Sequence, residues 1–306
     1  MSASIHMDIA GIHFAIHCEG LPVIPDPWPS YASFLTPPSV GKSDVRIDLR
    51  VAVGGGPELK TLSKLFDGES WSLFRHGDGY CLALNPSVSG VPPAWVACVD
   101  RDFTEGTVFC DEMLVRDNDG VRGIVNPILH RLDQLLTMYI LARRRGILVH
   151  AAGAGVHGRG YIFAGRSGAG KSTIARRFAE DATTRGGITL FSDDRMVIRE
   201  FSDGVRAFGT PWAGDAGIAL NDSVPLTAIF FLCQAATNRI EPLDAKSALE
   251  RILPLVSVPW YDREMIVRIT GFCDDLTRRV PAYDLHFLPT SEVVGLIRQF
   301  AVERGT

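Results

Sequence analysis

Apolar and polar residues alternate along much of the first 120 positions, a pattern typical of half-buried β-strands. Short turn-rich segments separate the alternating stretches. Strands are predicted at residues 8–18, 45–53, 71–74, 80–84, 95–99 and 107–114. We therefore expect residues 1–121 to form a β-rich N-terminal domain.

The pattern changes near Asn126, where apolar residues begin to recur every three or four positions through Ile140. This spacing predicts a helix, and Pro127 suits its first turn. Beyond it, apolar strands alternate with helical stretches. Strands are predicted at 147–156, 160–164, 188–192, 226–233 and 285–288, and helices at 173–179, 244–253 and 291–300. Alternation of this kind indicates an α/β domain over residues 122–306.

A glycine-rich motif lies between the strand at 160–164 and the helix that follows. Its residues are Gly165, Arg166, Ser167, Gly168, Ala169, Gly170, Lys171, Ser172 and Thr173. They fit G-x-x-x-x-G-K-[ST], in which backbone N–H groups surround phosphates, the lysine reaches the β- and γ-phosphates and the hydroxyl after it ligates Mg²⁺. Strand, glycine loop and helix N-terminus together favour a phosphate site. The motif predicts that a nucleoside triphosphate binds here.

Two carboxylates, Asp193 and Asp194, directly follow the predicted strand 188–192. After a phosphate-binding helix, the end of a strand is where the acid that holds the metal is expected. Neighbouring residues of a strand point to opposite faces, so one would face the nucleotide and the other the acceptor. The sequence leaves open which is the base and which the metal ligand, and a plain polar turn is the alternative. Residues 209–217 are too rich in glycine for regular structure and predict a mobile loop facing the substrate.

Composition narrows the functional classes. Hydrophobic residues make up 46% of the 306 positions, the net charge is −4, and no block of like charge indicates a nucleic-acid surface. No apolar run is long enough to cross a bilayer, and the first residues do not resemble a secretory signal. The six scattered cysteines fit buried thiols better than disulfides, and His13 and His17 fit a packed or solvent-facing pair better than a metal site. We expect a cytoplasmic protein.

These motifs together resemble HPr kinase/phosphorylase, whose P-loop fold is shared with ATP-dependent phosphoenolpyruvate carboxykinase. Three features of residues 147–198 carry the resemblance: the loop Gly165–Thr173, the aspartate pair, and His150, which lies at the family's spacing of fifteen residues before Gly165. The resemblance implies that one aspartate deprotonates the serine being phosphorylated, with His150 assisting. It also implies that Ser172 and the other aspartate, assigned here to Asp194, hold Mg²⁺. From the residues alone, a packed strand-end residue is the favoured interpretation of His150.

The chain also departs from HPr kinases. Asp193 follows Lys171 by 22 positions, more than is usual, and residues 183–187 are the expected insertion. The downstream glycine- and arginine-rich signature of those kinases is missing, and residues 1–120 have no counterpart in them. The protein HPr is therefore not the expected acceptor. The chain looks more like the HPr-kinase-related proteins of peptide natural-product clusters, such as lasso-peptide precursor kinases.

The sequence thus predicts a kinase that uses ATP and Mg²⁺ to phosphorylate a serine or similar hydroxyl of a peptide, protein or small molecule. The alternative is a regulatory or assembly protein that binds a nucleotide without transferring phosphate to an acceptor. Neither a nucleic acid nor a membrane is expected as a partner, and a homo-oligomer is left open. The sequence does not identify the acceptor or the preference for ATP over GTP.

Overall fold

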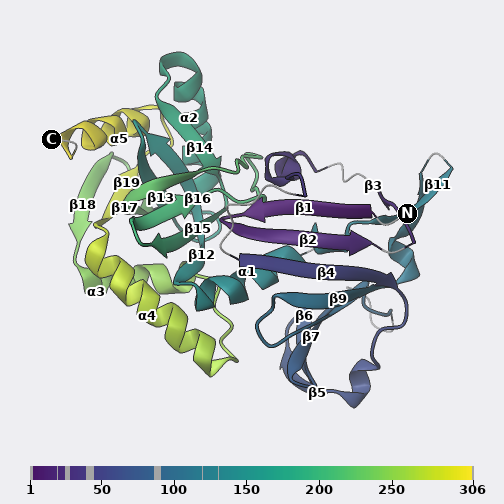
Figure 1. Cartoon of the computed structure of the whole chain (residues 1–306). Helices are drawn as coiled ribbons and strands as arrows, with labels where there is room; N and C mark the ends of the chain where they lie inside the picture. The colour runs from purple at the N-terminus through teal and green to yellow at the C-terminus, as the bar shows by residue number, and fades with distance from the viewer. Residues whose placement is uncertain are drawn as a thin grey trace. The chain divides into compact units, whose positions relative to one another are not determined.

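The computed structural model describes residues 3–18, 20–24, 28–38, 45–85, 91–118, 120–129 and 131–304. The chain is mixed α/β and divides into two compact units, and Figure 1 labels most of their strands and helices. The N-terminal unit comprises Met1–Pro29 and Leu35–Ile140, and the C-terminal unit comprises Ser30–Phe34 and Leu141–Thr306. The division falls within helix α1 (Leu132–Arg143), later in the chain than the boundary predicted near residue 121.

An eight-stranded sheet, in the order β1-β2-β4-β9-β8-β7-β6-β5, forms most of the N-terminal unit. Its strands are β1 (Ala3–Ile9), β2 (Ile12–Cys18), β4 (Val45–Val53), β5 (Ser63–Asp67), β6 (Trp71–His76), β7 (Gly79–Leu84), β8 (Trp95–Val99) and β9 (Glu105–Cys110). The β-rich character predicted for this region is confirmed. The Tyr139 ring of α1 stacks on Phe103, in the connection between β8 and β9, with centroids 3.9 Å apart.

Several predicted elements differ in detail. Residues 8–18 are not one strand: Ala10 and Gly11 have φ of 53° and 76°, which makes a tight hairpin turn between β1 and β2. The predicted strand 107–114 stops at Cys110 and continues as the 3₁₀ turn η3 (Glu112–Leu114). The helix expected from Asn126 is interrupted by Arg131 at φ 73°, which separates the turn η4 (Pro127–Leu129) from α1.

The remaining elements of this unit are short. The 3₁₀ turn η1 (Pro29–Phe34) begins here and lies mostly in the C-terminal unit, while η2 (Leu59–Thr61) precedes β5. A second sheet has three strands, β10 (Val115–Asn118), β11 (Val121–Val125) and β3 (Val23–Ile24).

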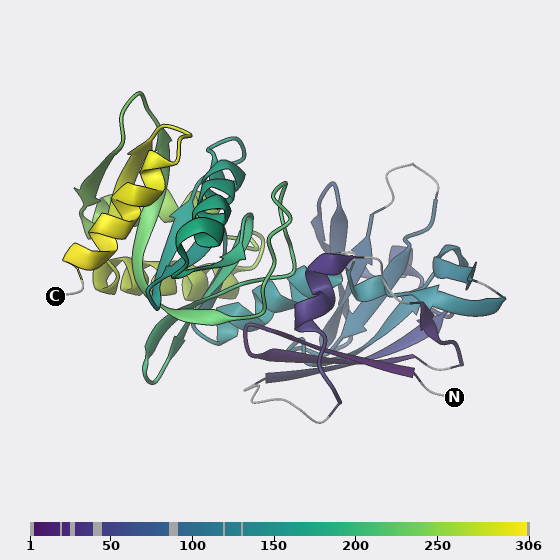
Figure 2. The ribbon, with the colours of Figure 1, turned by 90° about the horizontal axis from the view of Figure 1, so that it is seen from above.

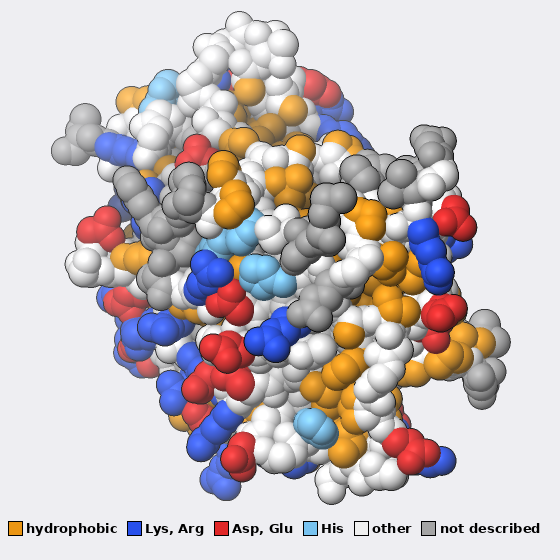
Figure 3. All heavy atoms as spheres, turned by 45° about the vertical axis from the view of Figure 1, so that its right-hand side comes forward, with side chains coloured by type: hydrophobic (Ala, Val, Ile, Leu, Met, Phe, Trp, Pro, Cys, Tyr) orange, Lys and Arg blue, Asp and Glu red, His pale blue; other side chains and the backbone are white. Residues whose placement is uncertain are grey.

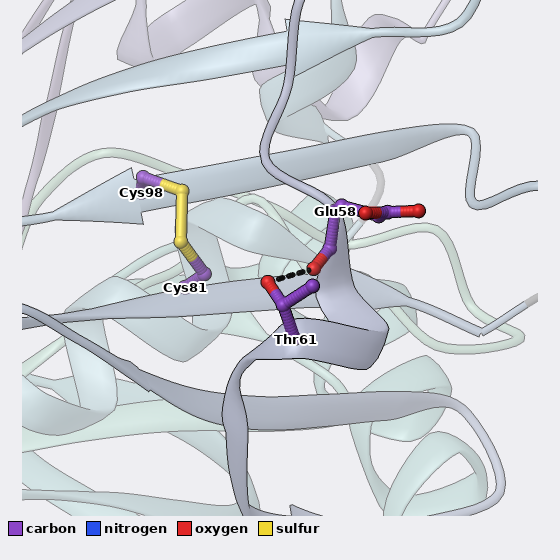
Figure 4. The surroundings of a disulfide bond; sticks show 4 residues. All are labelled: Glu58, Thr61, Cys81 and Cys98. Carbon is purple, nitrogen blue, oxygen red and sulfur yellow. Dashed lines mark hydrogen bonds between the residues drawn. A yellow bond between two sulfur atoms is a disulfide. The ribbon is translucent and has the colours of Figure 1, made fainter.

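The prediction that all six cysteines are free thiols is wrong for one pair. Cys81 on β7 lies directly opposite Cys98 on β8, with Cα atoms 4.1 Å apart, and the two form a disulfide. Figure 4 shows the bond near η2, where the Thr61 hydroxyl donates to the Glu58 carbonyl. Register across two strands creates this pairing, and a separation of 17 residues gives no sequence signal for it. Cys18, Cys110 and Cys273 are buried thiols as expected, and burial raises their pKa to about 11, 12 and 12.

The histidines of β2 pack as the sequence predicted, and β1 adds a third. His13 is buried, and its Nε2 lies 3.2 Å from Nδ1 of His6, while His17 lies 3.7 Å from Asp48. Burial, with the neighbouring histidines, lowers the pKa of His6. Among the described residues, no further His, Cys, Asp or Glu completes a set of three ligand atoms within 4.8 Å here. The three histidines are therefore held by packing and by contacts with one another and with Asp48.

The C-terminal unit is built on a second eight-stranded sheet. Its strands are β12 (Gly146–Val156), β13 (Arg159–Ala164), β14 (Ile188–Ser192), β15 (Arg195–Phe201), β16 (Gly204–Phe208), β17 (Ser223–Gln234), β18 (Arg239–Leu243) and β19 (Ala282–Phe287). The strands predicted at 147–156 and 160–164 are confirmed and pair antiparallel as the hairpin β12–β13. β12 pairs with β15 along residues 146–150 and with β13 along residues 151–156. β13, β17 and β19 run parallel, so their carboxyl ends meet at one edge of the sheet.

Four helices pack on this sheet: α2 (Lys171–Arg185), α3 (Ala245–Ile252, followed by the turn η5, Leu253–Leu255), α4 (Arg263–Arg279) and α5 (Glu292–Glu303). Figure 2 shows α2 and α5 side by side, and both contribute to one apolar core with the sheet. Phe163, Phe178 and Phe230 are the large rings of that core. The glycine-rich motif therefore lies beside an apolar core that the helices and the sheet share.

One helix of this unit was not predicted. Helix α4 was missed, although Met265, Ile269, Phe272 and Leu276 recur at helical spacing and are buried. The segment 183–187, expected as an insertion, forms the last turn of α2 and its cap at Gly186, where φ is 68°. None of the helices that the structure describes has the length and apolarity needed to cross a membrane.

Candidate functional site

The middle of β12 connects the glycine-rich loop, defined as residues 165–170, to the acidic pair, Asp193 and Asp194. The His150 carbonyl accepts a hydrogen bond from the Gly165 N–H at 3.2 Å. The next residue, Ala151, donates its N–H to the Asp194 carbonyl at 3.0 Å. The fifteen-residue interval between His150 and Gly165 thus places the histidine beside the start of the loop, so the three predicted motifs share one location.

The glycine-rich loop joins the end of β13 to the first turn of α2. Gly168 and Gly170 have φ of 80° and 103°, a backbone region that favours glycine. A Cβ on Gly170 would lie 2.6 Å from the Phe287 ring, and one on Gly165 would lie 2.7 Å from the Ala169 side chain. These glycines are therefore required by conformation and by close packing.

The end of the loop is also the N-terminus of a 15-residue helix. The first N–H groups of a helix have no intrahelical acceptor, and its dipole favours negative charge at this end. Arg166, Ser167 and Gly168 are exposed, so the loop is open to a ligand. Ser172 and Thr173 lie in the first turn of α2 and are partly buried. All nine residues of the motif accordingly form one loop and helix start that can bind an anion.

Lys171 lies beneath the loop and is nearly enclosed, with 5% of its surface exposed. Its Nζ donates to the Arg166 carbonyl at 3.1 Å and lies 4.0 Å from Oδ1 of Asp194. Burial lowers the pKa of the Lys171 ammonium, although the charge of Asp194 opposes this shift. The carboxylate of Asp194 offsets only part of the cost of burying this ammonium. A bound anion would therefore stabilise it.

Asp194 is the carboxylate on which the other charged groups converge. Its Oδ1 lies 2.6 Å from Nε2 of His150, and its Oδ2 lies 3.4 Å from Nε of Arg195. Burial by itself would raise the pKa of the Asp194 carboxyl, but the His150 hydrogen bond and the nearby positive charges hold that pKa below its usual value. About 31% of the side chain remains exposed. Asp194 is therefore ionised, oriented and accessible.

Asp193 has a different environment. It is completely buried, and its carboxylate accepts backbone N–H bonds from Gly214, Ala216 and Ile218 at 2.9, 2.8 and 3.2 Å. A Cβ on Gly214 would lie 2.8 Å from Oδ2 of Asp193, so the loop approaches this closely because the residue is glycine. The two carboxylates point apart, as expected for neighbours at a strand end. In this structure Asp193 anchors a loop and does not reach solvent.

The loop that Asp193 holds, residues 209–218, is irregular as predicted but is fastened at several points. Besides the bonds to Asp193, the Thr210 hydroxyl donates to the Arg195 carbonyl at 2.7 Å. Arg176 on α2 donates to the Asp215 carbonyl at 2.9 Å. These bonds do not fit the expectation of a mobile loop. The sequence carried little signal for them, because most of their partners are backbone groups.

Two residues near the loop were not foreseen. Gln234, at the end of β17, donates to the Gly168 carbonyl at 2.9 Å, and Phe287, at the end of β19, packs against Gly170. Both lie at the carboxyl ends of strands parallel to β13, where ligands bind in open α/β sheets. That rule, applied to the predicted strands, could have identified them.

Oxygen donors suited to Mg²⁺ are present at the site. The Ser172 hydroxyl and the Asp194 carboxylate are ligands of the hard type that this ion prefers. A second group of possible ligands in the same unit, Cys233, Asp284 and His286, is already occupied by Arg251, which bonds to Asp284 and lies 3.1 Å from Sγ of Cys233. The glycine-rich loop is therefore the better place for a metal bound together with phosphate.

Comparison with known proteins gives one family. A family model described as SynChlorMet cassette protein ScmC matches residues 125–292, which include His150, the glycine-rich loop and the acidic pair. No curated protein matches the chain. Because the matched residues exceed half of the 306, the chain belongs to the ScmC family of SynChlorMet cassette proteins.

Proposed function

We propose that the C-terminal unit is a P-loop phosphotransferase of the HPr-kinase type, which transfers the γ-phosphoryl group of ATP to a serine or similar hydroxyl. One observation carries the proposal. Oδ1 of Asp194 lies 2.6 Å from the His150 imidazole and 4.0 Å from the ammonium of Lys171, the lysine of the phosphate-loop motif. The cation that would bind the phosphate and the carboxylate that would activate the acceptor thus lie next to each other. Phosphoryl transfer requires this, because the donor and the acceptor must be held side by side.

The donor is assigned to the glycine-rich loop. Its backbone N–H groups and Lys171 would hold the triphosphate, with the exposed loop residues covering it. The Ser172 hydroxyl would hold Mg²⁺, which would neutralise charge on the phosphates. Asp194, which the resemblance made a second metal ligand, is assigned to the acceptor instead. Phosphoryl transfer asks the protein chiefly for position and charge neutralisation, and this loop supplies both.

The acceptor is assigned to the side of Asp194 that solvent reaches. A serine hydroxyl is a poor nucleophile at neutral pH, so a group must orient it and accept its proton. Asp194 is the carboxylate available for this, and the hydrogen bond from His150 fixes its position. Arg195, 3.4 Å from the other oxygen, adds positive charge near the developing phosphate charge. Asp193 was predicted as a catalytic residue together with Asp194, but here it anchors the loop 209–218.

The proposed use of ATP as the phosphoryl donor also bears on the cellular location. An ATP-dependent enzyme with several buried thiols fits the cytoplasm, and this is the compartment that we propose. The rival function is a nucleotide-binding regulator that uses the same loop and transfers nothing. The position of Asp194 favours the transferase, because binding alone does not need an accessible, histidine-oriented carboxylate beside the lysine.

The direct test is incubation of the full chain with γ-labelled ATP, Mg²⁺ and serine-containing peptides, starting with those encoded beside its gene. We expect label on a peptide hydroxyl, identified by mass spectrometry. The matched control is Lys171→Met, which should lose both nucleotide binding and transfer. If the wild type binds ATP but labels no acceptor and only hydrolyses it or leaves it intact, the regulator is the better description.

His150→Ala should move the acid limb of the transfer rate to higher pH. Asp194 must be ionised to accept a proton, so the rate falls as pH drops through its pKa. Burial raises the pKa of Asp194, and the hydrogen bond from His150 lowers it. Without His150 the pKa of Asp194 should therefore rise. The maximal rate should also fall by about 10–100-fold, the usual cost of losing a group that orients a functional residue.

A pH–rate profile of the transfer step measures both effects. His150→Gln is the matched variant, because its amide can still donate to Asp194, and its acid limb should lie nearer to that of the wild type. An acid limb of His150→Ala at or below the wild-type position would contradict the role given to His150.

A further inference from the structure

A second cluster of reactive side chains lies in the N-terminal unit and includes the two cysteines of the disulfide. Three adjacent strands bring His76 on β6, Cys81 on β7 and Cys98 on β8 to one face of the sheet. Cys98 lies directly opposite Cys81. His76 lies diagonal to Cys81, because the residue that pairs with Cys81 is Phe74, two positions before His76. The ligand atoms of all three residues lie within 4.8 Å of one another.

This cluster opens onto a cavity. The cavity has a volume of about 850 Å³, and its lining includes His76 and Cys98 together with Asp100, Glu105 and Thr107. His76 is exposed, and among the described residues its ring makes no hydrogen bond or ion pair. On the face of the molecule drawn in Figure 3, histidine side chains lie among acidic and basic ones. One side of the cluster is thus accessible to a small solute.

The other side of the cluster is apolar. Cys81 is completely buried and belongs to a small core with Phe74, Ala83 and Val96. Leu59, the first residue of the 3₁₀ turn η2, and Leu62, which follows the turn, pack against the same core. The sulfur atoms are therefore held by packed strands, and only the side with Cys98 and His76 faces solvent.

The state of the sulfurs depends on the redox environment. Disulfides persist in oxidising compartments, and in a reducing one cysteines at such positions are more often metal ligands or catalytic groups. Two thiols and an imidazole are the ligand types that Zn²⁺ prefers. We propose that the reduced Cys81–Cys98 pair, together with His76, binds one Zn²⁺ ion, and that oxidation to the disulfide abolishes this site.

The steps balance as two reactions. Two molecules of a thiol reductant give up two electrons and two protons to the disulfide, which yields the two cysteine thiols and one oxidised reductant disulfide. The ion then displaces the two thiol protons and forms two Zn–S bonds and one bond to the His76 imidazole nitrogen. Two thiolates on one tetrahedral zinc lie about 3.8 Å apart, since each Zn–S bond is about 2.3 Å. Cα atoms 4.1 Å apart on paired strands allow that separation once the S–S bond has opened.

Three protein ligands would leave one zinc position open, and His76 and Cys98 both line the cavity. A site of this kind is accessible to water or to a ligand from the cavity, unlike a closed structural site with four protein ligands. The cluster of Cys233, Asp284 and His286 does not compete, because Arg251 already supplies its positive charge. The inference does not depend on phosphoryl transfer and can fail or succeed separately from it.

Titration of the full chain with Co²⁺ tests the proposal. The reduced protein, freed of reductant under anaerobic conditions, should develop a thiolate-to-cobalt charge-transfer band that saturates at one ion per chain and is bleached by Zn²⁺. The oxidised protein should show no band. Cys98→Ser should abolish the band, and His76→Ala should weaken binding by at least about 10-fold, since even losing a group that only supports a metal ligand costs about 10–100-fold.

Cys233→Ser is the matched control and should leave the band unchanged. His76 is exposed, so its replacement keeps the test valid even if Cys98→Ser folds poorly, which circular dichroism will detect. Absence of a band in the reduced wild type would overturn the proposal. So would a band that survives both Cys98→Ser and His76→Ala, or one that disappears in Cys233→Ser.

Discussion

Asp194→Asn is expected to slow phosphoryl transfer by about 10³-fold, within the range of about 10²–10⁴ that a positioned acid or base contributes. The amide cannot accept the proton of the attacking hydroxyl, although it keeps the size of the carboxylate. ATP binding should largely survive, because the loop amides and Lys171 remain. Single-turnover transfer of labelled phosphate and a separate nucleotide-binding titration measure the two effects.

Asp215→Asn is the control for removing a negative charge near the loop. Its side chain is exposed, and the hydrogen bond from Arg176 goes to its backbone carbonyl, so transfer should change little. Transfer at the wild-type rate in Asp194→Asn would rule out the mechanism drawn for Asp194. Loss of ATP binding together with transfer would instead mean that this carboxylate acts mainly on the donor.

Asp193→Asn is expected to destabilise the protein by about 3 kcal/mol, through buried N–H groups that lose a charged acceptor. The carboxylate accepts from Gly214 and Ile218 through one oxygen and from Ala216 through the other. An asparagine has one oxygen, so its NH₂ group would face a backbone donor instead. Urea unfolding, with the midpoint and slope both fitted, measures the change.

Comparison with Asp194→Asn separates the two neighbours. Asp194 is partly exposed, and its replacement should change the free energy of unfolding much less than the replacement of Asp193. If Asp193→Asn had the free energy of unfolding of the wild type while Asp194→Asn did not, the role of Asp193 as the buried anchor of the loop would be wrong. A stable Asp193→Asn with lost transfer would return Asp193 to the role of base.

Adjacent positions at one strand end thus serve different purposes in this site. Asp193 points inward and holds the loop 209–218, while Asp194 points toward His150 and solvent. Thr210, bonded to the Arg195 carbonyl, ties the same loop to the start of β15. A disturbance of the loop should therefore reach Arg195 and Asp194, which makes loop stability part of the proposed function.

Much of this could be predicted because the signals are local. The glycine-rich loop needs its glycines for backbone conformation, and β12, β14 and β17 are apolar runs long enough to be strands. For His150, the resemblance to HPr kinases, whose spacing it matches, implied a position near the loop. Local signals were weaker at element ends, where a positive φ at Ala10 and at Arg131 changed the predicted boundaries.

The sequence by itself determined the glycine-rich motif, the strand before it, the helix after it and the acidic pair, because each depends on residues close together in the chain. The tertiary structure alone decided which aspartate is buried, since that depends on backbone donors some 20 residues later in the loop 209–218. It alone decided that Cys81 faces Cys98, because strand register sets that pairing. Contacts between distant segments carry no local pattern, and burial and register arise only when the chain is packed.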